Sequence, residues 1–151
     1  MSRLITESGL KKLKQELEEK SITVRQNIAN AIKEAKEQGD LSENAEYSAA
    51  KQQQAENEVR IAELEMMIKN AEVVKHDKRD SSAQIGSKVT VKTNGKEMLF
   101  EIVGINESDP STNKISNESP IGNALIGNEV GDRVEVSIPN GSMSYEIVAI
   151  S

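Results

Sequence analysis

Two carboxylate residues, Asp40 and Glu43, follow Gly39 closely and are the side chains of this sequence best suited to chemistry. The 151 residues include one His and no Cys, so multi-histidine metal sites, zinc fingers, disulfides and cysteine nucleophiles are excluded. Carboxylates three positions apart at a helix start can project on the same side, and their hard oxygens suit a Mg²⁺ ion that keeps most of its water. Because two carboxylates alone hold Mg²⁺ weakly, we expect the free chain to bind no metal stably. Such a site would work only beside ligands from another molecule.

The same spacing also has a purely structural explanation. Asp40 at an N-cap with Glu43 at the third helical position approximates a capping box, which normally begins with Ser or Thr. Acidic residues are expected in a first helical turn in any case, because they complement the helix dipole. On spacing alone, capping is favoured over catalysis.

The elements that must position these residues are two long helices. Thr6 is a candidate N-cap for the first, whose residues follow a heptad through Val24, with Lys20 at a d position. The apolar stripe continues from Ile28 after a small phase shift, as an inserted four-residue step would produce. Gly39 ends it, and a second helical stretch without Gly or Pro runs from Leu41 or Ser42 to Val74. We therefore predict an antiparallel coiled-coil hairpin over residues 1–75. On periodicity alone, a generic hairpin used for spacing or dimerisation is the favoured interpretation.

The rest of the sequence predicts a linker and a β domain. Residues 76–83 are polar and aperiodic, and His76 is interpreted as a solvated linker residue. From residue 84 to 151 the apolar period is two, with hairpin-turn dipeptides at Asn94-Gly95 and Asn140-Gly141. Ser119 and Pro120 begin one short helix. The fold class is therefore α+β, with an antiparallel sheet and a short helix that we expect to bind rather than catalyse.

Charge and hydropathy limit the partners and the location. The net charge of −6 argues against a protein that grips nucleic acid by its phosphates. No apolar run approaches the roughly 18–20 residues that span a bilayer, and the first residues show no export signal. We expect a cytoplasmic protein that does not associate with membranes and is monomeric.

The tip sequence also carries a resemblance. The run from Gly39 to Tyr47, Gly-Asp-Leu-Ser-Glu-Asn-Ala-Glu-Tyr, with Ala49-Ala50-Lys51 and Gln53 after it, resembles the signature of the GreA/GreB family of bacterial transcript cleavage factors. The similarity continues through Ser119-Pro120-Ile121, residues 124–127 and Gly131-Asp132, and covers essentially the whole chain.

The resemblance implies a function that neither periodicity nor spacing provides. Such factors insert a hairpin into the secondary channel of bacterial RNA polymerase and dock an FKBP-like C-terminal domain at its rim. When the polymerase backtracks, they stimulate its hydrolysis of the extruded nascent RNA 3′ end without being enzymes themselves. Asp40 and Glu43 match the acids that help to hold a second Mg²⁺ and a water in the polymerase active site.

Further residues match the family with less specific roles. Asn44, Glu46 and Tyr47 would support the tip, although packing of Tyr47 against the opposite helix is an equal alternative. Lys36 and Lys51 match basic residues that approach the RNA. The alternative is that they only form part of a charged, solvated helix face. The small number of basic residues near the tip resembles GreA more than its more basic paralogue GreB. This resemblance implies a preference for short extruded RNA.

A docking segment and two other functions complete the predictions. Ser119, Pro120 and Ile121 match the segment that faces the polymerase, a role compatible with helix capping. One alternative is a channel-binding inhibitor without cleavage activity, and another is a structural hairpin or chaperone.

Overall fold

The computed structural model describes residues 3–39, 43–77 and 79–151, which form two compact units. One unit is the hairpin, Lys11–Asn70, and the other combines Met1–Leu10 with Ala71–Ser151. The hairpin unit is thus shorter at both ends than the predicted domain of residues 1–75. In the described ranges no helix is both long and apolar enough to cross a membrane.

The first arm of the hairpin is a helix interrupted by a π-helical turn. It comprises α1 (Glu7–Glu19), the π turn η1 (Lys20–Val24) and α2 (Arg25–Glu37). The Thr6 hydroxyl accepts a hydrogen bond from the amide of Gly9 at 3.0 Å, which confirms Thr6 as the N-cap of α1. The change of phase predicted between Val24 and Ile28 directly follows the π turn, where the amide of Arg25 bonds to the carbonyl of Lys20 five residues earlier. A single wide turn, rather than an inserted four-residue step, therefore shifts the apolar stripe.

The second arm, α3 (Ala45–Lys69), is shorter than predicted. The prediction that it extends from residue 41 or 42 to Val74 is wrong at both ends. After Asn70 the chain forms β2 (Ala71–Val73), which pairs in parallel with β1 (Arg3–Ile5), and the Val74 amide donates to the Ile5 carbonyl at 2.9 Å. Pairing with residues near the start of the chain satisfies backbone groups that a helix would otherwise have used.

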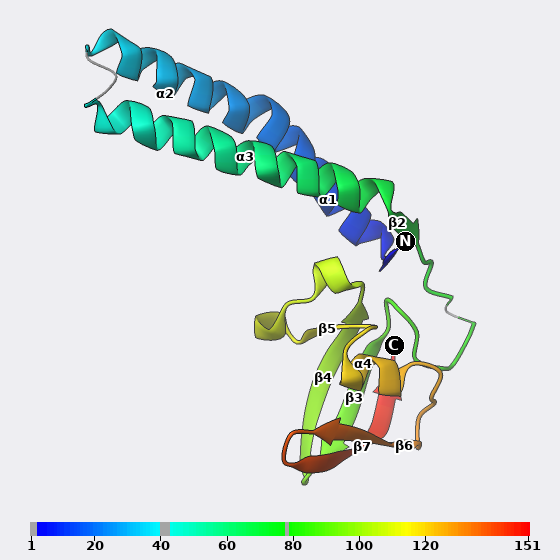
Figure 1. The fold of residues 1–151 in the computed structure, drawn as a ribbon. Coiled ribbons are helices and arrows are strands. Elements are labelled where there is room, and N and C mark those ends of the chain that lie inside the picture. Colours follow the sequence, from blue (N-terminus) through cyan, green and yellow to red (C-terminus); the bar gives the residue numbers. More distant parts are fainter. Residues whose placement is uncertain (1–2, 40–42, 78) are drawn as a thin grey trace. The chain divides into compact units, whose positions relative to one another are not determined.

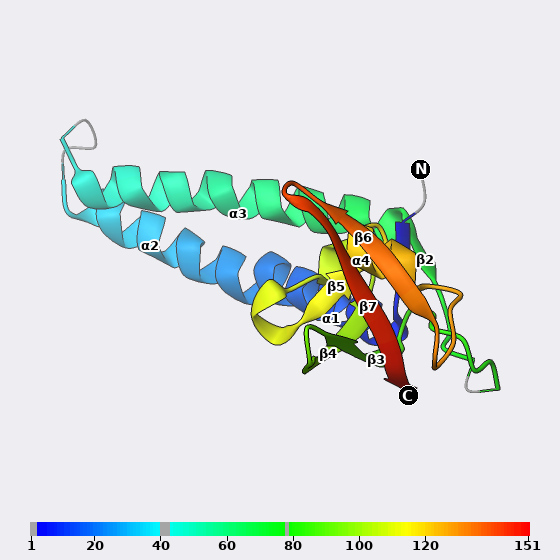
Figure 2. The same ribbon diagram turned by 90° about the horizontal axis from the view of Figure 1, so that it is seen from below.

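The two arms lie side by side over most of their length (Figures 1 and 2). At the end of the hairpin opposite the tip, the interface between the arms is apolar, and Leu64 is fully buried. Towards the tip the buried residues are mostly small, as Ala35 and Ala50 illustrate. Apolar burial, which stabilises by about 25 cal/mol per Å², is therefore concentrated away from the tip.

The C-terminal unit contains a five-stranded sheet in the order β5-β4-β3-β7-β6. Its elements are β3 (Lys88–Thr93), β4 (Lys96–Val103), β5 (Lys114–Ser116), α4 (Pro120–Leu125), β6 (Arg133–Ile138) and β7 (Gly141–Ile150), with 3₁₀ turns η2 (Ile105–Glu107) and η3 (Pro110–Thr112). Every pair is antiparallel except β4 with β5, so the sheet is mixed rather than wholly antiparallel.

The turns and the core of this unit follow the sequence pattern closely. Asn94 and Gly95 both have positive φ, which confirms the predicted hairpin turn. In the second hairpin Ile138 pairs with Gly141, so the two-residue loop is Pro139-Asn140, one position earlier than predicted. The core residues come from alternate strand positions, from the segment before β3 and from Leu125 of α4, and are Ala83, Ile85, Val89, Val91, Phe100, Ile102, Leu125, Val134, Val136, Tyr145 and Ile147.

Two polar networks hold the chain ends of this unit in place. His76 is half-buried, and its Nε2 lies 3.2 Å from the hydroxyl of the fully buried Ser87, so the interpretation of His76 as a solvated linker residue is wrong. In the second network, which we call the Glu107 network, the Glu107 carboxylate accepts hydrogen bonds from the amides of Thr6 (3.0 Å) and Gly104 (3.1 Å) and from the Thr6 hydroxyl. The start of α1 is thereby attached to the turn that follows β4.

Candidate functional site at the hairpin tip

The tip is the loop that joins α2 to α3. α2 ends at Glu37, the amide of Gln38 bonds to the Ala35 carbonyl at 3.2 Å, and Gly39 has a φ of +121°. A positive φ favours glycine, which explains why the helix stops there. Asp40 lies outside the described residues, so its predicted role is not located. Glu43 is described and is exposed.

Asn44 closes the base of this loop with both ends of its amide. Its Oδ1 accepts a hydrogen bond from the amide of Tyr47 at 3.1 Å, which makes Asn44 the N-cap of α3. Its Nδ2 donates to the carbonyl of Ala35 in the last turn of α2 at 2.7 Å. One half-buried side chain therefore satisfies a free amide at the start of one helix and binds a carbonyl in the last turn of the other.

This geometry overturns the capping-box interpretation of the acidic pair. Because α3 begins at Ala45, the N-cap is Asn44 and not Asp40. Glu43 precedes the cap and therefore does not occupy the third helical position that a capping box requires. Helix capping, the structural explanation that competed with a role in metal binding, therefore does not apply to Glu43.

The other predicted tip residues lie on the two helix ends. Glu46 is exposed in the first turn of α3, where its charge complements the helix dipole. Tyr47 is half-buried, so neither of its two predicted roles is selected. Lys36 is exposed in the last turn of α2, and Lys51 is exposed on α3, where its Nζ donates to Gln54 Oε1 at 2.9 Å.

The donor chemistry of the tip fits a hard divalent cation. The Glu43 carboxylate is exposed and is not used as a helix cap, and carboxylate oxygens are the ligands Mg²⁺ prefers. Within residues 3–39, 43–77 and 79–151, no three His, Asp or Glu side chains gather into a metal-binding group. A cation at Glu43 would therefore need ligands from elsewhere.

The predicted docking segment has defined structural duties. Ser119 is the N-cap of α4, because its hydroxyl accepts from the Gly122 amide at 3.1 Å and donates to the Ser116 carbonyl at 2.6 Å. Ile121 is half-buried against the core of the sheet, whereas Pro120, at the first helical position, is exposed. Of the three residues, Pro120 offers the most surface.

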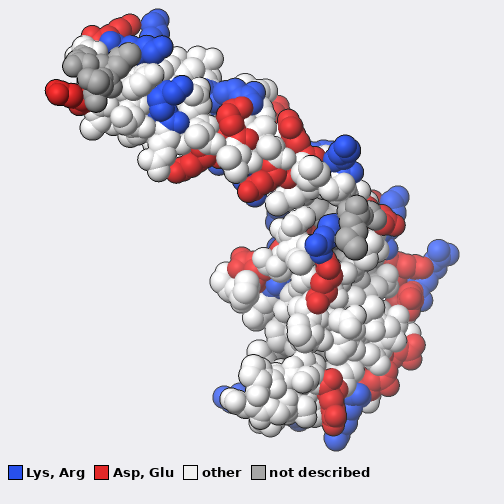
Figure 3. Space-filling view, in the orientation of Figure 1, with Lys and Arg blue, Asp and Glu red and all other residues white. Residues whose placement is uncertain are grey.

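Charges of both signs are distributed along the hairpin. In Figure 3 Lys and Arg are interspersed with Asp and Glu along it, and both signs occur near the tip. Two ion pairs link the first arm to α3: Arg60 to Glu16 and Arg25 to Glu58, each at 2.8 Å. Hydrogen bonding from Arg25 lowers the pKa of Glu58. The described part of the face in Figure 3 therefore offers no continuous binding strip for phosphates.

Sequence comparison identifies the class to which a helical hairpin with this tip and this β unit belongs. The family described as transcription elongation factor, N-terminal, matches residues 3–73, and the C-terminal family of transcription elongation factors GreA/GreB matches residues 78–151. The chain belongs to the GreA/GreB family of transcription elongation factors.

Individual relatives make the comparison more specific. The chain is 50% identical over 150 residues to transcription elongation factor GreA of Clostridium acetobutylicum, covering 97% of this chain and 95% of the relative. It is 47% identical to GreA of Acetivibrio thermocellus, covering 97% and 94%. Among solved structures, GreA factor homolog 1 of Thermus thermophilus matches with 29% identity and a TM-score of 0.46, covering 100% of this chain and 99% of that one.

Proposed function

We propose that this chain acts on bacterial RNA polymerase, entering its secondary channel with the hairpin and stimulating cleavage of the nascent RNA 3′ end in backtracked complexes. The observation that carries the proposal is the N-cap at Asn44. Because Asn44 caps α3, Glu43 is an exposed carboxylate at the end of a long hairpin with no capping duty. Asp40, three residues earlier in the same loop, would supply the second carboxylate.

The chain would contribute position and charge rather than a complete active site. Asn44 ties Ala35 to Tyr47 and so fixes the base of the loop that carries both acids. Glu43 and Asp40 would complete a Mg²⁺ site together with ligands of the polymerase. Mg²⁺ held there would activate water and stabilise the leaving oxygen, as in two-metal hydrolysis. The chain is accordingly a factor that stimulates another enzyme and not an enzyme itself.

Basic and docking residues have supporting roles in this proposal. Lys36 and Lys51 are exposed on the two helix ends that flank the loop, where their ammonium groups would approach the RNA. Exposed Pro120, held by the capped start of α4, would contact the rim of the channel. Glu46 and Tyr47 complete the first turn behind the loop.

The test is a transcript-cleavage assay with purified, backtracked bacterial elongation complexes in Mg²⁺ buffer. Wild-type protein should release short 3′ fragments. Asp40→Asn with Glu43→Gln should fold and bind the polymerase without releasing them, because amides keep the shape but lose the charge that recruits the cation. The matched control Glu34→Gln with Glu37→Gln removes the same charge from exposed positions of α2 and should retain cleavage.

Three results would contradict parts of the proposal. Cleavage retained by the double tip variant would remove the metal-recruiting role. Binding by the wild type without cleavage would make the chain a channel-binding inhibitor. An absence of binding would leave a structural hairpin.

A further inference from the structure

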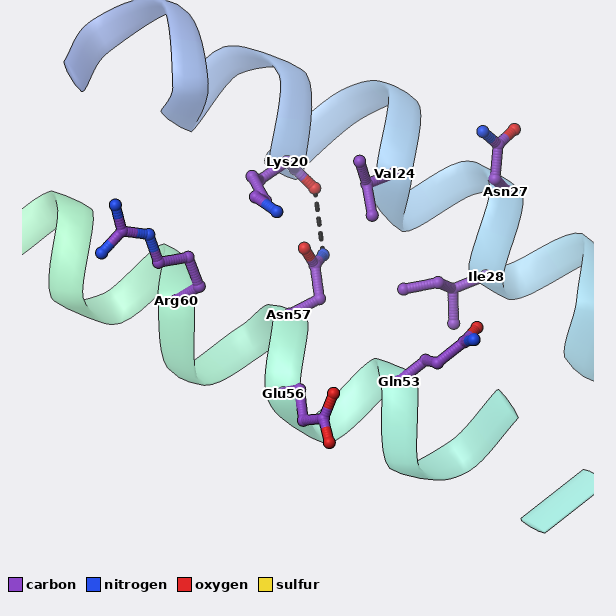
Figure 4. Close-up of a pocket in the computed structure, with 8 residues that line it drawn as sticks. All are labelled: Lys20, Val24, Asn27, Ile28, Gln53, Glu56, Asn57 and Arg60. Atoms are coloured by element: carbon purple, nitrogen blue, oxygen red, sulfur yellow. Dashed lines mark hydrogen bonds between the residues drawn. The ribbon is translucent and has the colours of Figure 1, made fainter. Parts of the chain in front are cut away.

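The tip half of the hairpin has little apolar packing to define how its two helices align. Of the described residues between Lys20 and Asn57, those that are buried are Ile28, Ala35 and Ala50. A cavity of about 380 Å³ opens between the arms, with Val24 and Ile28 on one side and Gln53 and Arg60 on the other (Figure 4). Because Ala35 and Ala50 are small and a cavity lies beside them, sliding one helix along the other would change the buried apolar area little. Apolar burial alone therefore distinguishes poorly between alignments of the two helices.

A buried polar side chain crosses the interface at the edge of this region. Asn57 of α3 is 6% exposed, and its Nδ2 donates a hydrogen bond to the backbone carbonyl of Lys20 at 3.1 Å. Figure 4 shows the amide of Asn57 reaching from one helix to the other. Its Oδ1 is buried and meets no hydrogen-bond partner among the residues that the structure describes. A buried acceptor left without a partner costs stability, so packing strength does not explain an amide here.

The acceptor of this bond is a backbone carbonyl in the π turn. Lys20 is the first residue of the π turn, and its oxygen also accepts the Arg25 amide. In a π turn the carbonyls are displaced from the regular α-helical pattern, so an oxygen there can receive an additional donor. One helical turn towards the start of the chain, Asn57 would meet the regular helix α1, and one turn towards the tip it would meet Val24, the last residue of the π turn and the N-cap of α2. The directional bond therefore distinguishes one alignment from its neighbours, as a buried Asn does in coiled coils.

We propose that Asn57 is a positioning residue that fixes the register of the hairpin at the π turn and thereby sets how far the tip loop reaches. Asn44 and Asn57 then hold the two ends of the weakly packed segment, through Ala35 and Lys20 respectively. The register is a property of the free chain, whereas its effect on reach rests on the proposed cleavage function.

The test uses the absence of cysteine, which allows two introduced thiols to be labelled cleanly. Ala29→Cys on α2 and Ala62→Cys on α3 are exposed and lie on opposite sides of the Lys20–Asn57 level, so their separation has an axial component. Double electron–electron resonance between spin labels should give one narrow distance for wild type. With Asn57→Leu a second component should appear, displaced along the axis by one turn, about 5.4 Å.

Controls separate register from packing and from function. Gln52→Leu makes a similar polar-to-apolar change at an exposed position of α3 that does not line the cavity, and should keep one distance. If Asn57→Leu does not fold, Asn57→Ala gives the same test with a smaller side chain. One unshifted distance in a folded Asn57 variant would overturn the proposal.

The cleavage assay then tests the effect on reach. Asn57→Leu should lower fragment release at least tenfold, while Gln52→Leu leaves it unchanged. A shifted register with full cleavage would refute the link to reach. A wild-type protein that releases no fragments would instead refute the proposed function and leave the register result standing.

Discussion

Replacing Glu107 by Ala should weaken the attachment of the first turn of α1 within the C-terminal unit. The carboxylate accepts from two backbone amides, those of Thr6 and Gly104, and from the Thr6 hydroxyl. Alanine would leave all three donors without this acceptor. Gly104 is buried, so its amide would have little access to water as a substitute.

The magnitude follows from the number and burial of these bonds. Hydrogen bonds to charged groups contribute about 1.5–3 kcal/mol each, and less where water can replace them. With one buried donor and two half-buried ones, we expect a loss of about 2–4 kcal/mol for Glu107→Ala. Glu107→Gln keeps one uncharged acceptor oxygen and should lose about half as much.

Native-state hydrogen exchange at the Thr6 and Gly104 amides is the appropriate assay, because local opening need not involve the hairpin. Protection should fall roughly 30- to 1,000-fold in Glu107→Ala, at tenfold per 1.4 kcal/mol. Glu97→Ala removes an equal charge from an exposed position of β4 and should leave both amides unchanged. Unchanged protection in Glu107→Ala would refute the reasoning.

Gly9 supplies an internal check on the same network. A Cβ added at Gly9 would overlap the Glu107 carboxylate. Gly to Ala inside a helix normally gains about 1 kcal/mol, yet here it should reduce protection, because the carboxylate must move. Since both changes displace the same group, Gly9→Ala with Glu107→Ala should cost clearly less than the sum of the two single changes.

Two further predictions concern the tip and acid stability. Asn44→Ala should destabilise the tip by about 0.5–2 kcal/mol, the usual cost of losing an N-cap, seen as faster exchange at the Tyr47 amide, whereas Ser48→Ala should have little effect. Hydrogen bonds from Arg25 lower the pKa of Glu58, and hydrogen bonds from the Ser111 hydroxyl and amide lower the pKa of Asp109. Because both pKa values are lower in the folded state, their stabilisation is present above about pH 4 and is lost as the pH falls further, so the thermal midpoint should drop on acidification. Arg25→Gln and Ser111→Ala together should flatten that drop, and an unchanged acid slope would contradict the assignment.

The regular features of the fold were predictable because their signals are local. Heptad spacing indicated both helices, and the Asn94-Gly95 dipeptide indicated a hairpin whose turn has the expected positive φ angles. The end of α3 was not predictable, since Ala71–Val73 continues a helical pattern and becomes a strand only by pairing with Arg3–Ile5. Such a partner, far away in the sequence, leaves no trace in the local pattern.

The site was predictable in its residue types but not in their roles. Asp40 and Asn44 are equally good N-caps by chemistry. What selects Asn44 is its second function, the donation of Nδ2 to Ala35 on the other helix, which only the folded hairpin reveals. The Asn57 bond was missed for a related reason, because its acceptor is a backbone carbonyl exposed by the π turn. A buried Asn in an otherwise apolar stripe is the signal that could have indicated it.

The C-terminal unit is discontinuous in sequence, and this has a consequence for synthesis on the ribosome. Its first segment, which includes β1 and Thr6, is made before the whole hairpin, and the partners of that segment, β2 and Glu107, follow only afterwards. Local helix pairs form faster than distant strand pairs. The hairpin can therefore fold while the opening segment is still unpaired, and its antiparallel closure brings that segment near the point where β2 will emerge. In this order the hairpin shortens the search of β1 for β2.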